Sequence, residues 1–412
     1  MVLRANHMVL RGCIFLLMFV GIFDPADKLL GLKVPAFILC WLVFLFYYVL
    51  NPVKIARKVY FYILLILFIP ALSMLYFEVF LGGGQTAALI LIKAYIFVSL
   101  IIILVAAKID LIPMLSRILF LLALVIILTK LLVMIFPELI PSLQVFGSTN
   151  GIVLLGDRFY FGDTTFQQIY FTASPMLLIS IAYYSDRAFR SGFFSWNSFF
   201  AFVSILGMVL AGTRSNMVGP VIVLVSIVIF NVKNKVLYST VLFLALIVFA
   251  SVFYSTNSTI VEVLSLQEES NSIKLELLRD YADIFNDPIN LIFGQGFGSY
   301  YYWEAKGYSD FISELSYLEL IRVYGLIFGI IMAGLILYPI LFVIASRREF
   351  SNRASIIGFT VYMAIAAINP LIFSSLGMSI ISAFMANIFR SREFDAVYMP
   401  NSYHYNNPSK LD

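Results

Sequence analysis

The stretch ILFLLALVIILTKLLVMIF, residues 118–136, decides the fold class. Lys130 is its only charged residue, and a helix of this length covers most of a hydrocarbon core of about 30 Å at about 1.5 Å per residue. Similar runs recur along a chain that is 62% hydrophobic and 12% charged, whereas soluble proteins are about 25% charged. Because a backbone in lipid must satisfy its own hydrogen bonds, the sequence predicts an all-α polytopic integral membrane protein.

The apolar runs predict about 12 transmembrane helices. Residues 1–253 carry the first nine, with an outer loop at 137–165; residues 254–314 form a large outer loop, 315–389 carry the last three spans, and 390–412 form a tail. The first run lacks a small-residue cleavage site, so we interpret it as a retained span. The expected spans are 9–23, 36–50, 59–77, 87–107, 118–136, 166–184, 197–212, 216–230, 237–253, 315–338, 354–369 and 371–389.

The distribution of charge sets the expected orientation. If the N-terminus is cytoplasmic, 17 of the 27 lysines and arginines fall in inner segments. Lys and Arg accumulate in cytoplasmic loops of membrane proteins, so we expect both termini to be cytoplasmic and the two long loops to face outward. Cys13 and Cys40 lie inside expected spans, which indicates neither a disulfide framework nor a metal site.

Four cations depart from this rule. Lys93, Lys130 and Arg322 lie inside expected spans, each roughly 9–12 Å below the outer surface at about 1.5 Å per residue, and Arg214 lies in an outer turn. Charges in spans are costly unless paired or hydrated. Snorkelling to the interface, or pairing such as that of Glu319 with Arg322 three residues later, explains each one singly. An anionic ligand in the outer leaflet, such as a lipid phosphate, explains all four together.

Two outer segments carry further candidate residues. The turn Ala211-Gly212-Thr213-Arg214-Ser215-Asn216 offers capping side chains, a helix N-terminus and a cation, which together suit an anion; an ordinary tight turn is the simpler interpretation. In the large loop, residues 270–285 have roughly helical apolar spacing and include Arg279 and Asp280, and Asp287-Pro288 should end that helix.

The rest of the large loop is rich in glycine and tyrosine. Gly294, Gly296 and Gly298 suit a backbone that passes close to a ligand, although as a nucleotide motif they are weak. Tyr301 and its aromatic neighbours suit either a sugar face or an interfacial belt. Glu314 opens the next span, where the helix dipole alone favours a carboxylate; a general base facing an outer cavity is the alternative.

The order of these motifs resembles the O-antigen polymerase family, which is related to the O-antigen ligases. The resemblance covers roughly residues 205–330: a Thr-Arg-Ser turn, a long loop with Arg279, Asn-Asp-Pro and Phe-Gly-Gln-Gly-Phe-Gly, and the re-entry Ser313-Glu314-Leu315. It implies a GT-C-like helical fold in the bacterial inner membrane. The activity implied is metal-independent joining of oligosaccharide repeat units, carried on undecaprenyl diphosphate, at the periplasmic face.

The resemblance also implies roles and partners. Arg214 and Arg279 match the family's arginines, and with Glu314 they are the candidate catalytic residues. The candidate substrate-binding residues are Lys93, Lys130, Arg158, Asp280, Gly294, Gly296, Tyr301, Lys306 and Arg322. No cofactor, metal or nucleic acid is implied; a chain-length regulator and a flippase are the expected protein partners. The ligases carry a histidine at the re-entry where this chain has Ser313-Glu314, which favours a polymerase over a ligase. A lipid-linked oligosaccharide flippase is the alternative from another class.

Overall fold

The computed structural model describes residues 2–83, 86–161, 164–192, 194–231, 269–346 and 353–398. The first elements are α1 (Val2–Phe23), α2 (Lys33–Leu50), α3 (Arg57–Leu81), α4 (Thr86–Ile96), α5 (Leu100–Ala106), α6 (Leu111–Ile135) and α7 (Ile140–Asn150). An antiparallel hairpin of β1 (Val153–Phe161) and β2 (Thr164–Phe171) follows, and then α8 (Leu177–Ser191), α9 (Trp196–Leu210) and α10 (Arg214–Asn231). The remaining elements are α13 (Glu269–Asn286), α14 (Pro288–Phe293), β3 (Tyr301–Trp303), β4 (Tyr308–Asp310), α15 (Ser316–Ser346), α16 (Arg353–Ala366) and α17 (Ser375–Tyr398).

Six helices among the described residues are long and apolar enough to cross a membrane: Asn6–Phe23, Lys33–Leu50, Arg57–Leu81, Thr86–Ala106, Leu111–Ile135 and Ser316–Ser346. The fourth runs through α4, a short 3₁₀ turn and α5. The chain is therefore a mainly α-helical, multi-pass membrane protein. These helices fall on six of the expected spans, and α9, α10 and α16 are shorter apolar helices on three more.

Two other expected spans are not confirmed as helices. The expected span 166–184 is wrong in its first part, because 164–171 forms strand β2, paired with β1 in the register Val153↔Phe171. This segment is rich in threonine and aromatic residues, which favour a strand over a helix, and α8 begins only at Leu177. The expected span 237–253 lies outside the described residues. The count of twelve spans and the GT-C-like arrangement stay predictions.

The last helix also differs from its expected bounds. A 3₁₀ turn at Pro370–Phe373 precedes α17, which begins at Ser375 and continues to Tyr398. The beginning of the expected tail 390–412 is therefore helical.

The helices pack around one large apolar core. Helix α17 contacts α4, α5 and α15, while α6 lies against α8 and α9. Close approach of α6 and α9 depends on a small residue: a side chain at Gly207 would overlap Ala123 of α6, as is usual where membrane helices pack tightly. Helix α6 starts at Asp110, whose carboxylate accepts the N–H of Ile112 at 3.1 Å, an N-cap that defines the helix start.

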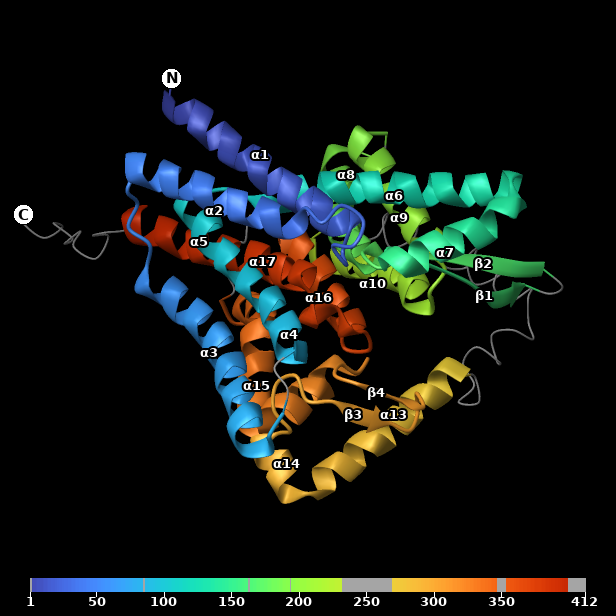
Figure 1. Ribbon diagram of the computed structural model, residues 1–412. Coiled ribbons are helices and arrows are strands. Elements are labelled where there is room, and N and C mark those ends of the chain that lie inside the picture. The colour runs from blue at the N-terminus through green and yellow to red at the C-terminus, as the bar shows by residue number, and fades with distance from the viewer. Residues whose placement is uncertain are drawn as a thin grey trace, which may run out of the picture.

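The described part of the large loop, residues 269–314, lies at one end of the bundle. Figure 1 shows α3 and α15 side by side, with α14 at their lower ends and with α13 and the hairpin β3–β4 beside α15. We call residues 269–314 the loop module. The expected amphipathic helix at 270–285 is confirmed as α13, which ends at Asn286, immediately before Asp287-Pro288.

Candidate functional site

The loop module has a small core of its own. Leu277, Tyr281 and Ile284 of α13 pack on Trp303 of β3 and on Leu315, which precedes α15. Helix α14 starts with Pro288 in its first turn, and the Asp287 carboxylate accepts the N–H of Ile289 at 3.0 Å. The Asp-Pro pair thus ends α13 and caps α14, which turns the chain back toward α15.

Helix α15 is interrupted where the loop module meets it. Gly325 has φ 76° and ψ 169°, a non-helical conformation inside the helix. The carbonyl of Arg322 accepts the N–H of Gln295 at 2.7 Å, and that of Val323 accepts the N–H of Gly296 at 3.1 Å and the hydroxyl of Ser73 at 2.9 Å. The glycine-rich segment and α3 therefore satisfy carbonyls at the break, as a discontinuous helix in a membrane requires.

Gly294 and Gly296 are packed closely against α15 and α3. A Cβ at Gly294 would lie 2.5 Å from the backbone nitrogen of Gly325 and 2.6 Å from the carbonyl oxygen of Val323, and a Cβ at Gly296 would overlap Phe77 of α3. Both residues have positive φ, which glycine adopts at little cost. The structure therefore explains these glycines by close packing against α3 and α15, and their expected approach to a ligand stays a prediction.

An ion pair lies at the centre of the contact between α15 and the loop module. Nη2 of Arg322 is 2.6 Å from Oε1 of Glu319, and Nε donates to Oε2 at 2.9 Å. The two side chains are 0% and 1% exposed. The pairing of these residues, one of the two interpretations from the sequence, is confirmed. Charged groups this deeply buried require such a partner.

The remaining donors of Arg322 bond the loop module. Nη1 donates to Oε1 of Gln295 and to Oγ of Ser299, each at 2.9 Å, and Nη2 donates to the carbonyls of Ser299 and Phe311 at 3.3 and 3.4 Å. All five N–H groups of a guanidinium thus have protein acceptors. A ligand contact by Arg322, which the sequence suggested, competes with these bonds.

Tyr281 completes this network from α13. Its hydroxyl donates to Oε2 of Glu319 at 2.8 Å. Burial raises the pKa of the Tyr281 phenol well above its usual value, and the Glu319 carboxylate raises it further. The phenol therefore keeps its proton at neutral pH and acts as a donor. The ring of Trp303 lies 5.7 Å from the Arg322 guanidinium, within reach of a cation–π contact.

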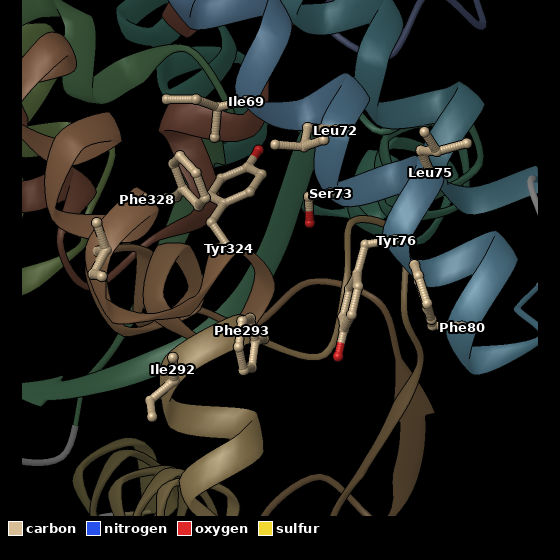
Figure 2. Close-up of a pocket in the computed structure, with 11 residues that line it drawn as sticks. Ile69, Leu72, Ser73, Leu75, Tyr76, Phe80, Ile292, Phe293, Tyr324 and Phe328 are labelled. Atoms are coloured by element: carbon tan, nitrogen blue, oxygen red, sulfur yellow. The ribbon is translucent and has the colours of Figure 1, made fainter.

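An apolar groove lies beside the break in α15 (Figure 2). Its volume is about 320 Å³, and it is lined by Ile69, Leu72, Ser73, Leu75, Tyr76, Phe80, Ile292, Phe293, Tyr324, Ile327 and Phe328, from α3, α14 and α15. Several of these side chains are exposed, including Leu75 at 56% and Phe293 at 59%. Since α3 and α15 have the length and composition of membrane spans, this groove presents an apolar surface at the point where the loop module begins.

The other predicted residues are spread over the predicted outer side. Arg279 and Lys93 are exposed, Asp280 and Lys130 are buried, and Tyr301, Lys306 and Glu314 are half-buried. Lys306 pairs with Asp310 at 3.6 Å, and the Asp280 carboxylate accepts the N–H of Ala305 at 3.5 Å. Arg158 lies in β1 and Arg214 is the first residue of α10; their side chains lie outside the described part.

A second group of outer residues surrounds the start of α10. Thr213 caps this helix, because its hydroxyl accepts the N–H of Asn216 at 3.2 Å, and the Asn216 amide donates to the hydroxyl of Ser174 at 2.9 Å. Burial raises the pKa of the Tyr170 phenol to about 12, and the Glu314 carboxylate contributes to the increase. The segment after β2 thus contacts the Thr-Arg-Ser turn through Ser174.

Sequence reasoning missed several residues of this arrangement. Tyr281 was expected only as an apolar position of the helix 270–285, Gln295 and Ser299 only as part of the glycine-rich segment, and Ser73 not at all; their bonds to Glu319, Arg322 and Val323 depend on the fold. Gly325 lies inside the expected span 315–338, and a glycine inside an apolar span is a signal for a helix break. Within the described ranges, no three His, Cys, Asp or Glu side chains are placed to hold a metal ion.

Comparison with protein-family models, with curated proteins and with solved structures finds no match to this chain.

Proposed function

We propose that this protein is a polysaccharide polymerase of the O-antigen type, which joins oligosaccharide repeat units carried on undecaprenyl diphosphate at the periplasmic face of the bacterial inner membrane. One observation carries the proposal: the loop module is bonded to α15 at an apolar groove, of which α14 of the module forms one wall and the membrane helices α3 and α15 form the others. A lipid-linked glycan is amphipathic in the same way, with an isoprenoid chain below a charged diphosphate and sugars. The order of motifs between residues 205 and 330 supports the same family.

The proposed reaction is a direct displacement that forms no covalent bond to the protein. The acceptor hydroxyl oxygen attacks the anomeric carbon of the donor, the bond from that carbon to the diphosphate oxygen breaks, and the lipid diphosphate leaves with the electron pair. Arg214 and Arg279 stabilise the charge that develops on it. The Glu314 carboxylate accepts the proton of the attacking hydroxyl. The exposed side chain of Arg279 on α13 is open to such a ligand.

The other candidate cations contribute to substrate attraction in the proposed function. Lys93, Lys130, Arg158 and Lys306 add positive charge on the predicted outer side, which attracts a lipid diphosphate through the field of the whole surface. Asp280, Gly294, Gly296 and Tyr301 belong to the loop module, and they act by shaping the surface that meets the sugars. The expected partners remain a flippase that supplies the substrate and a regulator of chain length.

A transporter for the same lipid-linked substrate is the second candidate. The specific observation in its favour is the break in α15, because discontinuous helices are common at the binding sites of secondary transporters. Only the polymerase needs the loop module to hold an acceptor glycan beside the donor.

Reconstitution separates the two candidates. Purified protein in liposomes is supplied with lipid-linked repeat units. Growth of polymer with release of lipid diphosphate supports the polymerase, whereas movement of the substrate across the bilayer without chain growth refutes it. In the same assay Glu314→Gln abolishes polymer; near-normal polymer from this variant removes Glu314 as the base.

A further inference from the structure

The buried pair Glu319–Arg322 joins three segments of the loop module to α15, in addition to the module's own apolar core and the backbone bonds at the break. Tyr281 of α13 bonds Glu319, while Gln295 and Ser299 of the glycine-rich segment and the carbonyl of Phe311 bond Arg322. Three separate segments of the loop module therefore converge on two side chains of one membrane helix.

We propose that Glu319, Arg322 and Tyr281 are positioning residues that hold the loop module against α15, beside the apolar groove. This role in placing the loop module does not depend on the protein's activity. Its effect on catalysis rests on the proposed polymerase function. None of the three touches substrate in this role. They act by fixing the segment 294–299 and α13, which carries Arg279.

Stability alone does not account for this pair. Taking two charges out of water is costly, and apolar side chains of similar volume often serve a fold equally well. A pair three residues apart on one helix forms just as readily on an exposed face, where no desolvation is needed. Burying it here gives directed hydrogen bonds to three loop segments, which apolar contacts do not provide. The planar fork of arginine suits this task better than lysine.

The segment that Arg322 holds also reaches the groove. Gln295 bonds the Arg322 side chain through its own side chain and the Arg322 carbonyl through its N–H. Tyr324, two residues after Arg322, and Phe293, two residues before Gln295, line the groove. A change at the Arg322 side chain should therefore affect both the glycine-rich segment and the adjacent groove wall.

The test replaces the pair without leaving a lone buried charge. In the double variant Glu319→Leu/Arg322→Met, packing is kept and the directed bonds are lost. Hydrogen exchange, measured without substrate, should be about tenfold faster or more in peptides covering 294–299 and 311–315, because these segments then open locally. Peptides from α6 should be unchanged. Arg190→Met, which removes an exposed ion pair with Asp186, is the matched control and should leave loop exchange unchanged.

A milder variant keeps the proposal testable if the double variant does not fold. Tyr281→Phe/Ser299→Ala removes loop bonds and retains the ion pair, and it should speed exchange in α13 and in 294–299 by about threefold or more, since weaker contacts open more often. Loop exchange equal to that of the wild-type protein in a folded double variant, or in this milder one, overturns the proposal.

Activity gives the second readout. With lipid-linked repeat units, kcat should fall by about tenfold or more in the milder variant while KM for the donor changes by less than about twofold, because orientation is lost and binding is retained. If the apparent kcat falls only in proportion to the amount of folded protein, the three residues have a merely structural role. If exchange responds as expected and wild-type protein makes no polymer, the proposed function fails and the positioning role stands.

Discussion

Gly325→Ala tests the interruption of α15 most sharply. A Cβ at this position would lie 2.7 Å from the carbonyl carbons of Ile292 and Phe293, and closer still to the Ile292 oxygen. These are backbone atoms of α14, which cannot move aside as a flexible side chain does. The conformation itself, φ 76° and ψ 169°, belongs to a region that is essentially restricted to glycine and costs other residues about 1–3 kcal/mol.

The two costs add. Overlap with a packed neighbour costs about 1–3 kcal/mol, so the substitution should destabilise the native arrangement by about 2–6 kcal/mol in total. The structure relieves this strain only by moving α14 away from α15 or by rebuilding the break. Either change lengthens the bonds from Gln295 and Gly296 to the carbonyls of α15, and both distort the groove.

The assay compares this variant with Gly334→Ala in the same helix. A Cβ at Gly334 meets nothing within 4 Å, and alanine favours a helix interior by about 1 kcal/mol over glycine. Equilibrium unfolding in detergent should thus show Gly325→Ala well below the wild-type stability and Gly334→Ala at or slightly above it. Equal stability of the two variants, with unchanged hydrogen exchange at 294–296, would refute the account of the break.

Three further predictions follow from other sites. Leu72→Trp fills the groove and should lower polymer formation about tenfold or more, because it excludes the lipid chain. The control is Leu64→Trp, at an exposed position of the same helix outside the groove, which should leave the rate within about twofold. Equal effects of the two variants on the rate contradict the groove's role. Arg279→Ala should abolish long chains and change stability by less than about 0.5 kcal/mol, since this side chain is exposed; retained long chains, measured by gel, would remove it from the site. For Asp24, burial opposes the charged form, but the backbone N–H groups of Leu30, Leu29 and Lys28 outweigh it and lower the pKa; these bonds stabilise the fold above the ordinary pKa of about 4 and are lost as pH falls through the lower folded-state value. Asp24→Ala should cost about 1–3 kcal/mol at neutral pH, and an unchanged unfolding midpoint would contradict this.

Much of the helical framework follows from the sequence alone. Apolar runs such as 118–136 are long and uninterrupted, so composition decides both their type and their approximate ends. The helix α13 and its end at Asp287-Pro288 were also predictable, because periodicity and proline are local signals. The hairpin β1–β2 was not, since a short apolar segment is equally compatible with a strand, and the partner strand 153–161 is what selects one.

The site was less accessible to prediction. The sequence indicated that Arg322 was unusual and offered both a ligand and Glu319 as explanations, but only the fold brings Gln295, Ser299 and Phe311 to it. Gly294 and Gly296 were expected to pass close to a ligand, which stays a prediction; the neighbours that the structure gives them are α15 and α3. Local patterns report that a residue is constrained; the identity of its partner depends on contacts between segments far apart in the chain.

The central claim is that the groove at the break in α15, bounded by α3, α14 and α15, holds the lipid part of a lipid-linked glycan. Photo-crosslinking tests it directly, with a photoactivatable group placed near the diphosphate end of the isoprenoid chain and the labelled peptides mapped by mass spectrometry. Labels should concentrate on α3, α14 and α15, and Leu72→Trp should reduce them there. Labels spread over α1 and α2, with no response to Leu72→Trp, would contradict the claim.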